Sequence, residues 1–143
     1  DTVKVIEQNA FVRCSLNYIR MPRRLKELGS YAFYSSALKK ITVYGKVELG
    51  ETFKYCKKLK TVVLKEGVKE LGELVFHQCP KLRSVTVPKS VKSLVCIYDN
   101  IFYYRGLKCN LSKLTIKTPK NSEMYRYRKF WKKRYKIKVK VIK

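Results

Sequence analysis

Apolar residues recur along this chain in a fixed order, at a spacing of roughly 22 residues, which indicates a repeat architecture. Each unit has an apolar residue at a Leu-Gly-like step, then a Phe, a small residue, a Leu and an alternating apolar pair. In the best-formed unit these positions are Leu71, Phe76, Cys79, Leu82, Val85 and Val87. Because these columns align over five units, the order is far more than a chance pattern in one segment.

The alternating end of each unit predicts a short β-strand with one side in the core. The Leu that precedes it is Leu16, Leu38, Leu59, Leu82 and Leu111, and we expect all five to be buried. The first strand is expected near residues 16–21, ended by Pro22, because proline removes a ladder donor. Stacking one unit on the next would cover its open apolar flank, and each side chain buried in this way contributes roughly 1.5–3 kcal/mol.

Strand alternation directs two further columns toward solvent. They contain hydroxyls, bases, one tyrosine and one valine, and no acid. The predicted outward residues are Tyr18, Lys40, Thr61, Ser84 and Lys113 in one column and Arg20, Thr42, Val63, Thr86 and Thr115 in the other. Such a face is either a partner-binding surface or an ordinary solvated sheet, since Thr and Lys are common at exposed strand positions.

The run LGSYAFYSSALKKITV, the Cys at the small position of other units and the following VTVPKSVKSL together resemble BspA-like leucine-rich repeats. The resemblance covers residues 3–116, with Ser36 in place of Cys and Thr52 in place of Ala as departures. It implies a leucine-rich repeat solenoid that winds as a right-handed superhelix, mainly β with short helical turns. The end of the chain is similar to the helix-strand cap on which many of these proteins finish.

The fifth unit breaks the pattern, because it is about six residues longer than the others and Arg105 replaces the small residue. Its extra residues are apolar and aromatic, which suits either a plug over the end of the core or a binding loop. Cys96 and Cys109 lie in this unit and could pair.

The C-terminal segment, residues 117–143, predicts a cap made of a helix and a strand. Asn121 or Ser122 is a suitable helix N-cap, and Met124, Tyr127 and Trp131 then fall on one helical face. The end of the chain alternates apolar residues with Lys, as a half-buried strand does. The rival interpretation is a basic amphipathic helix for a membrane or a nucleic acid. We expect residues 1–143 to form one domain.

Charge enlarges the range of partners. The 143 residues include 34 Lys+Arg and 10 Asp+Glu, a formal charge of +24, while 45% hydrophobic content is too high for a disordered basic tail. Such a surface attracts polyanions, whether glycan, nucleic acid, anionic wall polymer or lipid. The candidate polyanion residues are Arg126, Arg128, Lys129, Lys132, Lys133 and Arg134. The alternative is a generally basic, lysine-rich surface with no specific partner.

No catalytic constellation is readable in the sequence. Cys14, Cys56 and Cys79 share one repeat column, which favours small buried residues over metal ligands. His77 is the one histidine, so acid–base chemistry would depend on it alone. We therefore expect a non-enzymatic protein without metal or cofactor.

The family resemblance implies an interaction or adhesion module of a cell-surface or secreted protein that binds a protein or glycan on its strand face. The chain opens at Asp1 inside a repeat unit and shows no signal peptide. Because repeat arrays usually carry a polar cap at each end, we expect an artificially trimmed piece, a mature form or the C-terminal part of a longer array.

Overall fold

The computed structural model describes residues 2–94 and 111–143 of the chain. Its elements are mostly short strands. In chain order they are β1 (Val5–Ile6), β2 (Glu27–Leu28), β3 (Lys40–Val43), β4 (Glu48–Leu49), β5 (Thr61–Leu64), β6 (Glu70–Leu71), β7 (Ser84–Thr86), β8 (Ser93–Leu94), the 3-10 turn η1 (Leu111–Lys113), β9 (Thr115–Thr118), α1 (Glu123–Arg126), α2 (Arg128–Tyr135) and β10 (Lys138–Val141).

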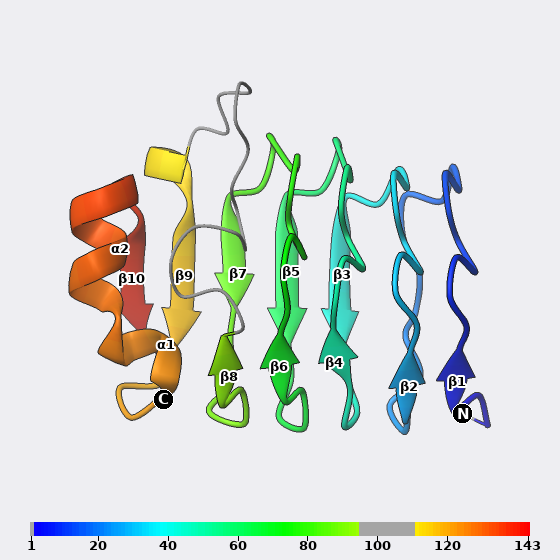
Figure 1. Cartoon of the computed structure of the whole chain (residues 1–143), viewed down its shortest axis with the longest axis horizontal. Helices are drawn as coiled ribbons and strands as arrows, with labels where there is room; N and C mark the ends of the chain where they lie inside the picture. The colour runs from blue at the N-terminus through cyan, green and yellow to red at the C-terminus, as the bar shows by residue number, and fades with distance from the viewer. Residues whose placement is uncertain (1, 95–110) are drawn as a thin grey trace.

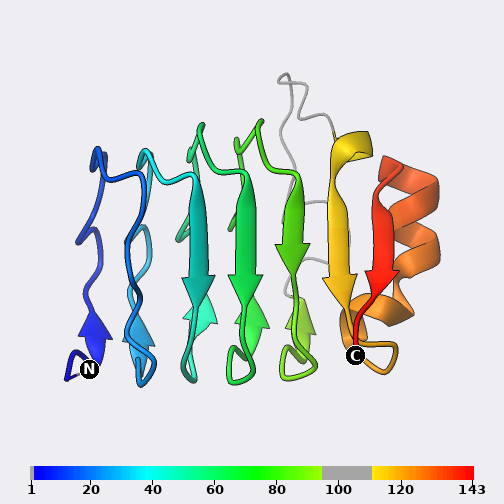
Figure 2. The same ribbon diagram turned by 180° about the vertical axis from the view of Figure 1, so that it is seen from behind.

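The strands form two layers, and the paired strands described are parallel (Figure 1). One layer is a five-stranded sheet with the order β10-β9-β7-β5-β3, which faces the viewer in Figure 2. The other consists of the three-stranded sheet β4-β6-β8 and the pair β1-β2. Each of the middle units gives one strand to each layer, so the predicted repeat fold, mainly β with few helices, is confirmed. The two ends of the chain lie at opposite ends of the row.

The core between the layers is built from ladders of like side chains. Phe11, Phe33, Phe53 and Phe76 stack with centroid separations of 5.1, 5.7 and 6.0 Å and nearly parallel rings. Beside them, the thiol of Cys56 donates to the carbonyl of Phe33 at 3.0 Å. Cys56 is buried and Cys14 half-buried, so this cysteine column is mainly a core feature, as the alignment predicted.

The backbone repeats as faithfully as the side chains. The residue two positions after each phenylalanine has a positive φ, between 54° and 64°, although none of these residues is glycine. They are Arg13, Ser35, Tyr55 and Gln78. The amide of such a residue donates to the next unit, for example from Tyr55 to the carbonyl of His77 at 2.8 Å. A hydrogen bond that holds each turn can therefore offset the cost of the left-handed conformation.

The prediction of a first strand near residues 16–21 is wrong. No strand is assigned within residues 16–21, and Leu16 is 43% exposed rather than buried. This segment has a described neighbour on one side only, where Lys39 donates to the carbonyl of Asn17 at 3.0 Å. One-sided pairing followed by Pro22 leaves the segment extended but without a regular ladder.

The register of the last repeat strand also differs from the prediction. Thr115 lies opposite Ser84, and Lys117 lies opposite Thr86. The alignment had placed Lys113 and Thr115 at these two positions, two residues too early. The 3-10 turn η1 takes up residues 111–113, so Leu114 rather than Leu111 enters the core, and Leu111 is half-buried. The irregular residues 95–110, with Cys96 and Cys109, lie outside the described residues.

The cap consists of two helices and a strand rather than a single helix and a strand. Ser122 is the N-cap of α1, and its side chain accepts a hydrogen bond from the amide of Tyr125. Met124 and Trp131 are buried, so the helices use their apolar face to cover the core. Strand β10 then pairs with β9. Within residues 2–94 and 111–143, no helix is long and apolar enough to span a bilayer.

Candidate functional site

The outward side chains of the five-stranded sheet form one exposed surface, which we call the outer face. Burial alternates along its strands, so that Ile41 and Val43 are buried while Lys40 and Thr42 point outward. Register then places outward residues in two rows. The rows are Lys40, Thr61, Ser84, Thr115 and Lys138, and Thr42, Val63, Thr86, Lys117 and Lys140. Neither row contains an acid.

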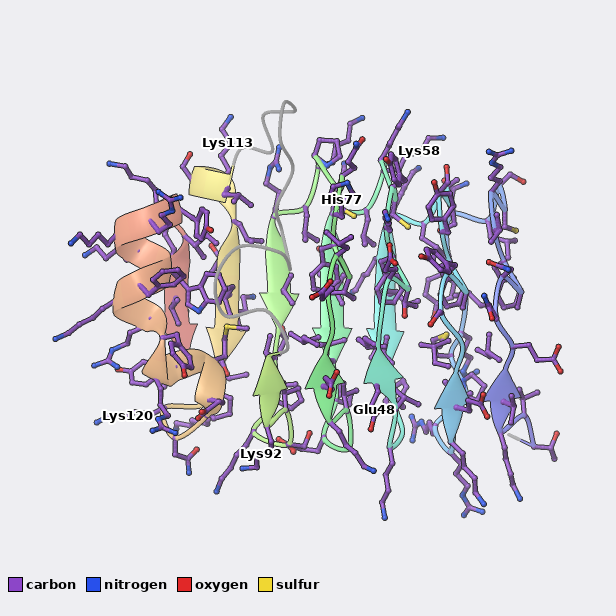
Figure 3. The ribbon with its side chains drawn as sticks, viewed as in Figure 1. Glu48, Lys58, His77, Lys92, Lys113 and Lys120 are labelled. Atoms are coloured by element: carbon purple, nitrogen blue, oxygen red, sulfur yellow. The ribbon has the colours of Figure 1, made fainter. Side chains whose placement is uncertain are left out.

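The structure places five of the predicted strand-face residues in these rows, while Tyr18 and Arg20 precede the sheet and Lys113 lies elsewhere. Lys40, Thr42, Thr61, Ser84 and Thr86 occupy the rows as expected. Lys113 does not, because it belongs to η1 and projects at the edge of the molecule (Figure 3). Lys117, Lys138 and Lys140 also lie in these rows, although the sequence prediction did not include them in the binding face. The alternation of Lys and Val near the end of the chain had predicted a half-buried strand with Lys138 and Lys140 outward.

A hollow lies at the N-terminal end of the outer face. It has a volume of about 510 Å³ and is lined by Tyr18, Ile19, Arg20, Met21, Arg23, Lys40, Thr42 and Tyr44. Four predicted residues, Tyr18, Arg20, Lys40 and Thr42, are thus brought together although residues 16–21 form no strand. Three bases line the hollow and no acid does, and the Tyr18 side chain is 65% exposed. This arrangement suits an anionic or hydrogen-bonding group of a ligand.

A second hollow, which we call the cap groove, lies between α2 and β10. Its volume is about 910 Å³, and its lining residues are Tyr125, Arg128, Lys129, Lys132, Lys133, Lys136, Ile137, Lys138, Val139 and Val141. Six of these are bases and none is an acid. Val139 and Val141 add an apolar surface to the groove, and the buried Ile137 lies beneath it. The guanidinium of Arg128 already makes a cation–π contact, since it lies 4.2 Å from the ring centroid of Tyr125.

The six predicted polyanion residues therefore divide into two groups. Arg128, Lys129, Lys132 and Lys133 line the cap groove. Arg126 and Arg134 do not. Arg126 instead forms an ion pair with Glu123 at 2.9 Å, and this pair raises the pKa of the arginine.

The opposite layer of the molecule carries acids where the outer face has none. Glu48 and Glu70 lie side by side in register on β4 and β6, and Glu27 begins β2 in the same way. Glu48 projects from this layer in Figure 3. The sheet surfaces thus differ in charge, and the outer face is the one suited to an anionic ligand.

A polar and aromatic cluster also lies outside the outer face. The hydroxyl of Tyr31 donates to the carboxylate of Glu51, which also pairs with Lys54. Partial burial opposes ionisation of Glu51, but the hydrogen bonds from Lys54 and Tyr31 outweigh it and lower the pKa of the carboxyl group. Tyr34 and Tyr55 pack next to this cluster with ring centroids 5.3 Å apart. Because Tyr31, Glu51 and Lys54 bond to one another, we interpret this cluster as structural rather than as a binding site.

The candidate catalytic side chains, His77 and Cys56, are buried among residues of the fold. His77 is buried, and its ring packs edge-on against Tyr55 at 5.6 Å. Burial raises the pKa of the Cys56 thiol, which disfavours the thiolate needed for reactivity or metal binding. Within the described part of the chain, no group of three or more His, Cys, Asp or Glu side chains is arranged to hold a metal ion.

Comparison with known proteins agrees with the repeat seen in the fold. The model of the BspA type leucine-rich repeat region (6 copies) matches residues 1–108 and residues 50–132. No curated protein matches the sequence. Among solved structures, the chain is similar to a leucine-rich repeat protein from Bacteroides ovatus ATCC 8483, with 19% identity and a TM-score of 0.34. That match covers 99% of this chain and 52% of the other, so this chain spans about half of that protein. Since the family model matches most of its length, the chain belongs to the BspA-type leucine-rich repeat family.

Proposed function

We propose that this chain is a non-catalytic interaction module that binds a protein or glycan ligand on its outer face. The observation that carries the proposal is an exposed surface spanning five strands without an acid, with a basic hollow at one end. Repeat proteins present extended surfaces of this kind to partners, because each unit adds one strand to the same face. Leucine-rich repeat families are generally non-enzymatic, which supports the non-catalytic assignment.

The hollow would provide an anchor and the rows of hydroxyls would provide adaptable contacts. Arg20, Arg23 and Lys40 offer charge-assisted hydrogen bonds to a carboxylate, sulfate or phosphate group. Tyr18 and Tyr44 add amphipathic aromatic surface, a residue type enriched where proteins meet their partners. The Thr and Ser side chains of β5 and β7 then donate and accept hydrogen bonds along the ligand.

An array of extracellular proteins and glycans tests this proposal. The chain would be compared with a triple variant, Thr61→Glu, Ser84→Glu and Thr86→Glu, which introduces acids in the middle of the outer face. The matched control is Glu48→Lys with Glu70→Lys on the opposite layer. We expect the triple variant to lose the ligands that the unmodified chain and the control retain. Equal binding by the triple variant would overturn the proposal.

Polyanion binding by the cap is the second candidate function, favoured by six bases and no acid in the cap groove. A heparin column with a salt gradient tests it, using a variant with Arg126, Arg128, Lys129, Lys132, Lys133 and Arg134 changed to Gln. Retention beyond about 0.5 M salt that disappears in the variant would support a concentrated site, because screening removes diffuse attraction at that ionic strength. Early elution of both proteins would exclude this candidate.

The proposal also covers the handedness of the solenoid, the domain organisation of the chain and its location. The units would wind as a right-handed solenoid, because crossovers between parallel strands of one sheet are overwhelmingly right-handed. Units 3–116 and the cap 117–143 would form one domain of a cell-surface or secreted protein. Membership of the BspA-type family supports that location.

A further inference from the structure

We propose that the free edge of β10 and the cap groove beside it bind an extended acidic peptide, which adds as a further strand to the five-stranded sheet. This site lies at the C-terminal end of the sheet, beyond the central part of the outer face proposed above as the ligand surface. Three observations carry it: the orientation of the β10 backbone, the apolar side chains next to it and the charge around them.

The backbone of β10 has one side available for pairing. β10 is the last strand in the sheet, and β9 is its neighbour among the described residues. The amides of Lys138 and Ile142 point toward β9, where they donate to the carbonyls of Leu114 and Thr118 at 3.1 Å each. Since successive residues of a strand direct their backbone groups to opposite sides, those of Val139 and Val141 point away from β9. They provide the donors and acceptors with which an added strand pairs.

The side chains of β10 alternate in the same way, with lysines on the outer face and valines on the groove side. Lys138 and Lys140 are exposed on the outer face. Val139 and Val141 line the cap groove on the other side, and Val141 is 53% exposed. An added strand whose residues alternate between acidic and apolar would place its acids beside the lysines and its apolar side chains beside the valines.

Charge selects the occupant. The bases of α2 that border the groove, Lys129, Lys132 and Lys133, favour an acidic segment and repel a basic one. A second copy of the chain is a poor partner at this edge, because pairing one β10 with another would bring their lysines together. A sulfated glycan or a nucleic acid would satisfy the bases but has no peptide backbone to pair with the outward groups of Val139 and Val141. A peptide can place its acids beside Lys138 and Lys140, its apolar side chains beside the valines and its backbone along β10, while the bases of α2 attract it at longer range.

Lysines on an edge strand also protect it against aggregation, so the experiment must separate a binding edge from a protected one. The probe is a fluorescent Glu-Val-Glu-Val-Glu-Val peptide, titrated with the full chain and followed by anisotropy. The decisive variant is Val139→Pro, which removes an outward amide while leaving the bonds to β9 in place, as proline tolerates edge positions. Val139→Ala is the matched control, because it shortens the side chain but retains the amide.

We expect the peptide to bind the unmodified chain, and Val139→Pro to bind it about tenfold more weakly than Val139→Ala does. A peptide N-methylated on the amides facing β10 should lose affinity for the unmodified chain by a similar factor, and this arm holds even if the proline variant fails to fold. Methylation on the alternate amides should have little effect. The Thr61→Glu, Ser84→Glu, Thr86→Glu variant should still bind the peptide, which separates this site from the central outer face.

Three results would overturn the inference. One is equal affinity of the two Val139 variants and of all methylated peptides, which would mean attraction by charge alone. Another is tight, cap-dependent retention on heparin without measurable peptide binding, which would assign the groove to a polyanion. The third is a dimer in light scattering that dissociates in Val139→Pro, which would assign the edge to a second copy of the chain.

Discussion

At the scale of single residues, Thr52 is in conflict with its surroundings. It is fully buried in the column that holds Ala32 and Val75, and its hydroxyl has no hydrogen-bond partner in the described structure. An unmatched buried hydroxyl carries a desolvation penalty. We therefore expect Thr52→Val, which keeps the side-chain shape, to stabilise the chain by roughly 1 kcal/mol. Urea denaturation measures the change. Ser36→Ala is the contrast, because the Ser36 hydroxyl lies 3.4 Å from the Cys56 sulfur. Destabilisation by Thr52→Val would contradict this account.

Glu51 should make the stability of the chain depend on pH. Burial opposes its ionisation, but the bonds from Lys54 and Tyr31 lower its pKa below the ordinary value of 4.5. A carboxyl group whose pKa is lowered on folding stabilises the fold above its unfolded pKa, and that contribution is lost as pH falls through the folded pKa. We expect Glu51→Gln to cost roughly 0.5–1 kcal/mol at pH 7, since such partly exposed pairs are worth little more.

Thermal unfolding of this variant between pH 7 and pH 3 checks the sign of the effect. The two proteins should converge at the acidic end, where Glu51 itself becomes protonated. Glu48→Gln, at an exposed position of β4, is the matched control and should differ little from the unmodified chain. A gap between Glu51→Gln and the unmodified chain that widens toward low pH would contradict the assignment.

At the scale of elements, the turn after β3 depends on Gly45. Its φ is +92°, and an added Cβ would lie 2.0 Å from the carbonyl oxygen of Leu25 in the preceding unit. Gly45→Ala should lower the free energy of unfolding by roughly 1–3 kcal/mol, because backbone strain and a clash with Leu25 act together. Gly50→Ala is the matched control, as the nearest atom to its added Cβ is the Ser30 Oγ at 3.4 Å. Similar unfolding midpoints for the two variants would contradict this reasoning.

The elements also show how far the sequence could be interpreted. The middle units were predicted well, because their apolar columns report stacking with neighbours on both sides; Leu38, Leu59 and Leu82 are all buried. The prediction failed at both ends. Leu16 is exposed where the stack has one described neighbour, and η1 shifts β9 by two residues. A 3-10 turn leaves no periodic signal of its own in so short a segment.

The candidate sites followed the same rule. The outward positions of Tyr18 and Arg20 were predicted despite the missing strand, because an extended segment also alternates its side chains. The cap groove could not be foreseen, since it depends on how α2 lies against β10 rather than on the pattern within either element. Sequence patterns thus predicted the faces of elements, and the hollows between elements required the structure.

For the whole molecule, the phenylalanine ladder predicts that a substitution costs more in the middle of the stack than at its end. Phe53 is fully buried between the rings of Phe33 and Phe76, whereas Phe11 is half-buried and, among the described rings, stacks on Phe33 alone. In a repeat array, stability is approximately the sum of the units and of the interfaces between neighbours. Phe53→Ala weakens two such interfaces and leaves a large cavity, so we expect it to cost about 3–5 kcal/mol.

Phe11→Ala should cost clearly less, and it should leave the cooperative unfolding of the other units intact. Equilibrium urea denaturation gives both free energies, and hydrogen exchange shows which units open. After Phe11→Ala, loss of protection should be confined to the first unit; after Phe53→Ala it should extend to β3, β5 and β7, because these strands cover the same part of the core. Equal losses of unfolding free energy with uniform loss of protection would mean that the stack unfolds as a single cooperative unit. Nearest-neighbour coupling would then not describe this protein.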